Sequence, residues 1–191
     1  MNVKNLGEFG LIEMIKKMVG TSSTVVQGIG DDCAVLPFDR NNFFLLTCDM
    51  LVEDEDFTRR DQPYWVGRKS LGCCLSDVAA SGGKPVYAQV CLGLPSRITV
   101  NWVRWLYRGI ISIGTEFGVK IVGGDLSRSD KLVIDISLTG LVERKNLVLR
   151  QGAKKGDIIF VSGELGGSIY PQTKGLGAGL HAKHLTFMPR V

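Results

Sequence analysis

Four acidic positions in this sequence lie beside glycines or apolar runs that would hold them rigidly. They are Asp31-Asp32 after a glycine, Asp49 at the end of an apolar run, Asp77 on a helical stretch, and Asp125 after two glycines. Hard divalent cations such as Mg²⁺ prefer oxygen ligands and complete their coordination with water and substrate phosphates, so a few aspartates suffice. Convergence of these positions would therefore form a site for magnesium ions and phosphate groups.

A simpler interpretation of the same aspartates also stands. Aspartates beside glycines commonly cap helices or form turns, and each position taken singly fits that role. The acidic cluster Asp54-Glu55-Asp56 has the composition of a solvated loop. The aromatic side chains of Tyr64, Trp65, Trp102 and Trp105 are expected to pack in the core or between helices rather than to stack on bases.

Several other kinds of chemistry are excluded by residue types and spacing. Both histidines, His181 and His184, fall late in the chain, so its body cannot build a histidine zinc site or a Ser-His-Asp triad. The five cysteines include no Cys-x-x-Cys pair and are expected to be reduced thiols. The chain also lacks the Walker A motif and the protein-kinase signatures, so a nucleotide enzyme would need another architecture.

Hydrophobic periodicity predicts alternating helices and strands, which argues for an α/β protein or an α+β sandwich. Helices are expected at Leu6–Met18, Tyr64–Ala80 and Trp102–Phe117. Strands are expected at Phe43–Cys48, Val86–Leu94, Val119–Val122, Leu132–Val142 and Ile158–Val161, with a turn at Gly123-Gly124-Asp125.

Composition bounds the class of protein. The chain has 191 residues, a net charge of +4 and scattered Lys and Arg, so it lacks the charge pattern of a nucleic-acid binder. No signal peptide or membrane-spanning apolar run is present, and we predict a cytoplasmic protein without a membrane partner. The pattern weakens after Gly163, which predicts one domain over 1–163 and the start of a truncated second domain over 164–191.

Five motifs, in this order along the chain, resemble the thiamine-monophosphate kinases. That family belongs to the wider superfamily of aminoimidazole ribonucleotide synthetase, and the resemblance extends from Leu6 to about Gly167. The motifs are Leu6-Gly7-Glu8-Phe9-Gly10-Leu11-Ile12, Gly30-Asp31-Asp32-Cys33-Ala34, Thr47-Cys48-Asp49-Met50-Leu51-Val52, Leu75-Ser76-Asp77-Val78-Ala79-Ala80 and Val122-Gly123-Gly124-Asp125-Leu126-Ser127.

The resemblance implies a set of site residues. The family positions that bind magnesium ions correspond to Asp32, Thr47, Cys48, Asp49, Asp77 and Asp125. The positions that contact ATP correspond to Gly124, Asp125 and Arg150, and Tyr107 would lie near the nucleotide. The implied reaction is direct in-line transfer of the γ-phosphoryl group of ATP to thiamine monophosphate, with metal-assisted positioning and no catalytic general base.

The resemblance also implies a fold and an assembly. We expect a mixed sheet with helices on one face, whose sheet pairs with that of a second subunit across a twofold axis to form a homodimer. The apolar fraction of 45% agrees with an interface of this kind.

The chain departs from the family pattern at two positions. Asp56 stands where the family usually has a histidine that touches thiamine monophosphate, and Cys48 replaces a more usual hydroxyl residue. Nothing in the sequence matches the ATP and substrate motifs of the family's second domain, so the 191-residue chain alone is expected to be inactive. Two alternatives stay open: another ATP-using enzyme of the superfamily, or a silent module for ATP binding and dimerisation.

Overall fold

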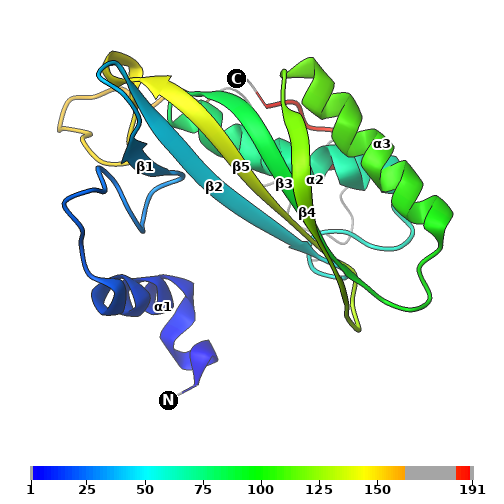
Figure 1. The fold of residues 1–191 in the computed structure, drawn as a ribbon. Coiled ribbons are helices and arrows are strands. Elements are labelled where there is room, and N and C mark those ends of the chain that lie inside the picture. The colour runs from blue at the N-terminus through cyan, green and yellow to red at the C-terminus, as the bar shows by residue number, and fades with distance from the viewer. Residues whose placement is uncertain (1, 162–183, 190–191) are drawn as a thin grey trace.

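The computed structural model describes residues 2–161 and 184–189 of the chain. Three α-helices, five strands and one 3₁₀ turn follow one another in these residues (Figure 1). The helices are α1 (Val3–Val19), α2 (Pro63–Ala80) and α3 (Val100–Glu116). The strands are β1 (Ala34–Pro37), β2 (Asn42–Val52), β3 (Lys84–Leu94), β4 (Lys120–Arg128) and β5 (Val133–Glu143), and η1 (Arg144–Asn146) follows β5.

The strands form one mixed sheet in the order β1-β2-β5-β3-β4. All neighbours are antiparallel except β3 and β4, which are parallel and joined through α3. The longest pairing joins β2 to β5 without interruption, from Asn42 opposite Glu143 to Val52 opposite Val133. The expectation of an α/β protein with a mixed sheet is therefore confirmed.

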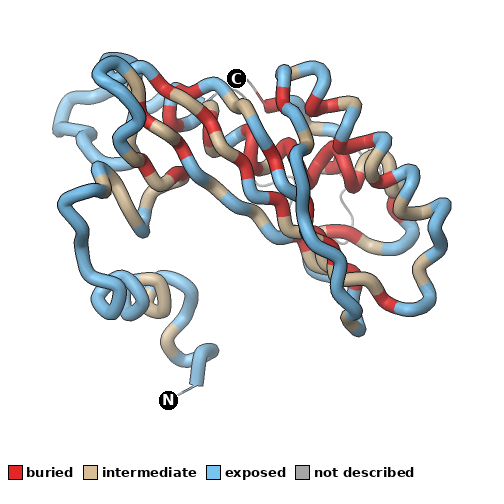
Figure 2. Tube along the Cα trace, viewed as in Figure 1, coloured by how far each residue is buried: buried red, intermediate tan, exposed pale blue. Residues whose placement is uncertain are grey.

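Helices α2 and α3 lie together on one face of the sheet, and the other face, the open face, has no covering element in the part of the chain that the structure describes (Figure 1). Side chains alternate between the faces along each strand, because successive residues of a strand point in opposite directions. Leu45, Val90 and Ile136 are buried beneath the helices, where the core is concentrated (Figure 2). The open face exposes apolar side chains, among them Met50 (60% exposed) and Tyr87 (51% exposed).

Helices α2 and α3 touch through their backbones at two glycines. A Cβ added at Gly67 would lie 2.1 Å from the carbonyl oxygen of Leu106, and one added at Gly109 would lie 1.9 Å from that of Tyr64. A larger side chain at either position would force the helices apart. The two glycines therefore set how closely α3 and α2 pack beside each other on the sheet.

Helix α1 stands away from the sheet, joined to it by an extended segment (Figure 1). The Asn2 side chain caps its first turn by accepting a hydrogen bond from the Asn5 backbone, and Gly20 ends it with a φ of 71°. None of residues 3–19 is buried. No helix among the described residues is long and apolar enough to cross a membrane.

Three details of the predicted elements are wrong. Asp49 lies inside β2, because pairing with β5 continues to Val52. The predicted turn at 123–125 is part of β4, which pairs with β3 beyond a register shift. The run Ile158–Val161 is exposed and forms no strand, since the described residues offer it no pairing partner. The predicted domain boundary at 163/164 lies outside the described residues.

Candidate functional site

Strand β2 and helix α2 bring Thr47, Asp49 and Asp77 together beneath the helical layer. Thr47 and Asp49 are two residues apart on β2 and so point to the same face of the sheet, toward α2. The Thr47 hydroxyl donates a 2.6 Å hydrogen bond to Oδ2 of Asp77. The Thr47 hydroxyl thus meets the Asp77 carboxylate across 30 positions of the chain, and the Asp49 carboxylate lies near enough for the charge of Asp77 to act on it.

Arg150 lies at one end of the group formed by Thr47, Asp49 and Asp77, where it binds Asp32. Its Nε and Nη2 donate to Oδ1 of Asp32 over 3.0 and 2.5 Å, and its backbone N–H donates to Oδ2 of Asp31 over 3.1 Å. Gly30 precedes the two aspartates with a φ of 114°, in the region that favours glycine. The turn predicted from the sequence therefore delivers Asp31 and Asp32 to the segment that carries Arg150.

Two partly buried carboxyls of the group, those of Asp49 and Asp77, resist ionisation. Burial, followed by the negative charges of Asp77, Asp56 and Asp135, raises the pKa of Asp49 to about 6. Burial also raises the pKa of Asp77, and the charge of Asp32 acts in the same direction, while the Thr47 hydrogen bond and Arg150 oppose it. Negative charge is thus concentrated beyond what Arg150 compensates, and a bound cation would relieve it.

Magnesium ions fit this donor set by its chemistry. The group consists of oxygen donors, and no cluster of three or more His, Cys, Asp or Glu side chains among the described residues forms a ready-made metal cage. Mg²⁺ usually takes one or two carboxylates and draws its remaining ligands from water and substrate phosphates. An open set of aspartates suits that cation better than a closed site for zinc.

The sequence-predicted residue Cys48 points to the open face, because it lies between Thr47 and Asp49 on β2. Its thiol is therefore directed away from the carboxylates, and its pKa is raised by partial burial and then by Asp135 and Asp49. Within one copy of the chain, only the backbone of Cys48 is available to the group.

The predicted nucleotide contacts on β4 lie at the opposite edge of the sheet. Strand order places β4 three strands away from β2, so Gly124 and Asp125 do not join Asp49 and Asp77 within one copy. Gly124 has a φ of 150°, and a Cβ there would lie 1.8 Å from the carbonyl oxygen of Val90, so the strand pairing itself requires glycine. Asp125 is exposed, and Tyr107 is half-buried on α3, which packs beside β4.

Asp56, predicted to touch the substrate, has a structural contact. Its Oδ2 accepts a 2.8 Å hydrogen bond from the backbone N–H of Val52 and closes the loop that follows β2. The sequence reasoning missed Lys69 and His184, which meet at this loop. A usable signal for Lys69 was its spacing of two helical turns before Asp77.

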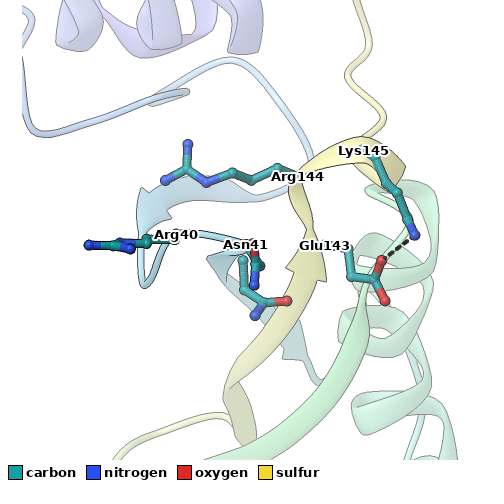
Figure 3. Close-up of a pocket in the computed structure, with 6 residues that line it drawn as sticks. Arg40, Asn41, Glu143, Arg144 and Lys145 are labelled. Atoms are coloured by element: carbon teal, nitrogen blue, oxygen red, sulfur yellow. Dashed lines mark ion pairs between the residues drawn. The ribbon is translucent and has the colours of Figure 1, made fainter.

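A separate cavity of about 530 Å³ lies at the turn between β1 and β2 and the end of β5 (Figure 3). Its lining residues are Arg40, Asn41, Asn42, Glu143, Arg144 and Lys145. Lys145 turns to Glu143 at 2.9 Å, and the Arg144 guanidinium lies 4.1 Å from the centre of the Phe43 ring. These cations are thus engaged with neighbours, and the cavity contains none of the predicted site residues.

The mixed sheet, its helical layer and the aspartates between strand β2 and helix α2 are features of a known class of domain. Residues 30–142 match the family described as AIR synthase related protein, N-terminal domain. The chain belongs to this family.

Among individual proteins, the chain is similar to thiamine-monophosphate kinases. It is 40% identical to that of Aquifex aeolicus (strain VF5) over 168 residues, which are 88% of this chain and 52% of the relative. It is 35% identical to that of Bacillus subtilis (strain 168) over 165 residues, 85% of this chain and 51% of the relative. The chain spans about half the length of the curated relatives it matches.

A solved structure extends the likeness to three dimensions. AaThiL complexed with AMPPCP and TMP superposes with a TM-score of 0.86 at 37% identity, covering 100% of this chain and 62% of that one. The resemblance found in the motifs is thereby confirmed.

Proposed function

We propose that the protein transfers the γ-phosphoryl group of ATP to thiamine monophosphate and forms thiamine diphosphate. The observation that carries the proposal is the group of Thr47, Asp49 and Asp77, with Asp32 and Arg150 at its end. Support comes from relatives named thiamine-monophosphate kinases and from the likeness to AaThiL bound to AMPPCP and TMP.

In this proposal the aspartates hold metal ions and abstract no proton. Asp32, Asp49 and Asp77, with Thr47 and the backbone of Cys48, are the residues that would hold magnesium. Bound magnesium would supply positive charge to the phosphates, and catalysis of this type consists mostly of positioning and electrostatic stabilisation. The planar guanidinium of Arg150, which binds Asp32 in this structure, suits a bidentate contact with a nucleotide phosphate.

We also propose that the complete site forms in a homodimer. Gly124, Asp125 and Tyr107 lie at the β4 side of the sheet, and Arg150 lies with Asp32 at the β1 side. One copy therefore separates the predicted nucleotide contacts, and a twofold arrangement that brings the β4 edge to the partner's β1 edge would reunite them. The exposed apolar side chains on the open face support such a contact.

The division of the chain is part of the proposal. We assign 1–163 to metal binding, nucleotide binding and dimerisation, and 164–191 to the start of a second domain. Turnover would require that second domain, because in-line transfer depends on fixing donor and acceptor together. The 191-residue chain alone is expected to bind Mg-ATP weakly and to form no thiamine diphosphate. The cytoplasmic location stays a prediction.

The proposal is tested in a protein that includes the proposed second domain, which is called the full-length protein below. Thiamine diphosphate is detected by chromatography after incubation with Mg-ATP and thiamine monophosphate. Asp77→Asn keeps the side-chain volume but removes the charge, and we expect it to lower kcat by about 100-fold or more. The matched control is Asp130→Asn, which removes an exposed carboxylate and should leave kcat unchanged. Full activity of Asp77→Asn would contradict the role of the aspartates. Mg-ATP binding without turnover by a wild-type protein that includes the proposed second domain would favour a silent binding module.

A further inference from the structure

A buried lysine lies at the end of the acidic group opposite Arg150. Lys69 is on α2 and only 6% exposed, and its ammonium donates a 2.6 Å hydrogen bond to the backbone carbonyl of Asp56. The same ammonium lies 2.6 Å from Nε2 of His184, in the segment that packs along α2. Nothing in the sequence motifs or in the proposed reaction assigns this residue a role.

Lys69 shares a helix face with the proposed metal ligand Asp77. Lys69, Cys73 and Asp77 are spaced four residues apart, which places them in one row along α2. Cys73, in the middle of the row, has its pKa raised to about 12 by burial and then by Asp49, with Lys69 opposing and Asp77 and Asp56 adding to the shift. These groups are therefore neighbours, and the row runs from Asp77 to the cation at Lys69.

The carbonyl that Lys69 binds belongs to the loop after β2. This loop is fixed at both ends by buried side chains, Glu53 (2% exposed) and Phe57 (1% exposed). Glu53 Oε2 accepts from the Leu132 N–H at 3.0 Å, and its Oε1 pairs with Arg59. Between these anchors, the backbone N–H of Asp56 donates to the carbonyl of Val52, and Lys69 connects this middle part of the loop to α2.

Packing alone does not explain a lysine here. Burying an ammonium is costly unless it is paired, and an apolar side chain of similar volume usually serves a core at least as well. Burial lowers the pKa of Lys69, while Cys73, Asp56 and Asp61 raise it, so the ammonium is held among acidic neighbours. The buried ammonium holds the Asp56 carbonyl and also contacts Nε2 of His184.

We propose that Lys69 is a positioning residue for the phosphoryl acceptor. It holds the Glu53–Phe57 loop beside Asp49, at the end of the acidic group opposite Arg150, the proposed nucleotide contact. The second phosphate bound by the group, that of the acceptor, would lie at this end. The inference rests on the proposed function for the identity of the acceptor, thiamine monophosphate. The hold on the loop itself rests on the geometry alone.

The test compares Lys69→Met with wild type in the full-length protein. Losing a charged hydrogen bond to the loop should raise the KM for thiamine monophosphate about 10-fold, while the KM for ATP stays within about twofold. Hydrogen exchange should accelerate at the backbone amides of 52–56, which are hydrogen-bonded in the loop, and remain unchanged in β3 and β5. The matched control is Lys145→Met, whose exposed lysine pairs with Glu143 far from the loop.

The two measurements separate the two hypotheses. If the wild type forms no thiamine diphosphate but Lys69→Met loosens the loop, the proposed function fails and the hold on the loop stands. If the wild type is active and Lys69→Met changes neither loop exchange nor the acceptor KM, the role of Lys69 is overturned. Should Lys69→Met not fold, Lys69→Gln supplies the same comparison. Failure of both to fold would also overturn the proposal, since Lys69 would then support the core.

Discussion

At the residue scale, burial and nearby charges together set how readily the carboxyls of Asp49 and Asp77 ionise. Thr47 stabilises the ionised form of Asp77 by donating a hydrogen bond, whereas burial destabilises the ionised forms of both Asp77 and Asp49. Arg150 compensates Asp32 at one end, and Lys69 lies at the other. The folded chain therefore holds more buried negative charge than its own cations neutralise, which is the state that a bound cation would stabilise.

The raised pKa of Asp49 predicts a pH-dependent stability. Its ordinary value of 3.8 rises to about 6 in the folded chain, so the folded state binds this proton more tightly than the unfolded state. Ionising Asp49 therefore destabilises the folded state. This loss of stability is absent below pH 3.8, grows between pH 3.8 and pH 6, and is complete above about pH 6. With a chelator present, Asp49→Asn should have the same free energy of unfolding as wild type near pH 3.8. At pH 7.5 it should be more stable by about 1–2 kcal/mol, because solvent screens a partly buried carboxyl.

Urea unfolding of both proteins across this pH range measures the difference, and Asp130→Asn controls for loss of an exposed carboxylate. Added Mg²⁺ should raise the Tm of wild type more than that of Asp49→Asn. Equal stabilities of the two proteins at every pH would contradict the assignment of a buried charge to Asp49.

At the element scale, α2 is the part of the fold that organises the site. It carries Asp77 toward β2 and Lys69 toward the loop after β2, so its distance from the sheet sets both contacts. The position of α2 on the sheet also depends on α3, which packs beside α2 and comes close to it at Gly67 and Gly109. Arg68 adds a polar tie between the helices, since its guanidinium binds Glu116 of α3 at 2.6 and 3.0 Å.

We predict that Gly109→Ala destabilises the protein by about 2–3 kcal/mol or more, because the added methyl group would overlap the Tyr64 carbonyl. Arg104→Ala, an exposed change on the same helix, should stay within about 0.5 kcal/mol of wild type. Chemical denaturation measures both. A fully stable Gly109→Ala variant would show that the helices can separate without cost.

At the scale of the whole molecule, one face of the sheet has no covering layer among residues 2–161 and 184–189. The open face presents Leu46, Met50 and Tyr87 to solvent, and the predicted nucleotide contacts lie at its two edges. Large exposed apolar patches of this kind mark interaction surfaces, and obligate dimers bury faces that resemble a core cut in half. A second copy of the chain is the occupant that would also complete the site.

We therefore expect a dimer in light scattering at micromolar concentration, and at least a 100-fold weaker dimer in Met50→Lys, because the charge would be buried in the interface. The matched control is Val100→Lys, which places the same charge at a 76% exposed apolar position on α3, outside the open face. A wild-type protein that remains monomeric at these concentrations would remove the proposed dimer and its shared site.

The sequence by itself indicated candidate residues for the site and most of the elements that carry them. Helical periodicity located α2 and α3 within two residues of their ends, since amphipathic spacing is a local property. The ordered motifs around Asp32, Thr47, Asp49 and Asp77 indicated the family before any fold was known. The glycine before Asp31 and Asp32 also indicated a turn, and at Gly30 the backbone takes the conformation that favours glycine.

Only the tertiary structure decided which of these residues meet. Thr47 reaches Asp77 across 30 positions, and Arg150 reaches Asp32 across 118, through strand pairing and helix packing that no local pattern encodes. The same pairing extends β2 beyond Asp49 and draws Asp125 into the far edge strand, because a strand continues as long as a partner supplies hydrogen bonds. The contact of Lys69 with the loop carbonyl of Asp56 is likewise a product of the tertiary fold, since burial and partners belong to the fold and not to the residue type.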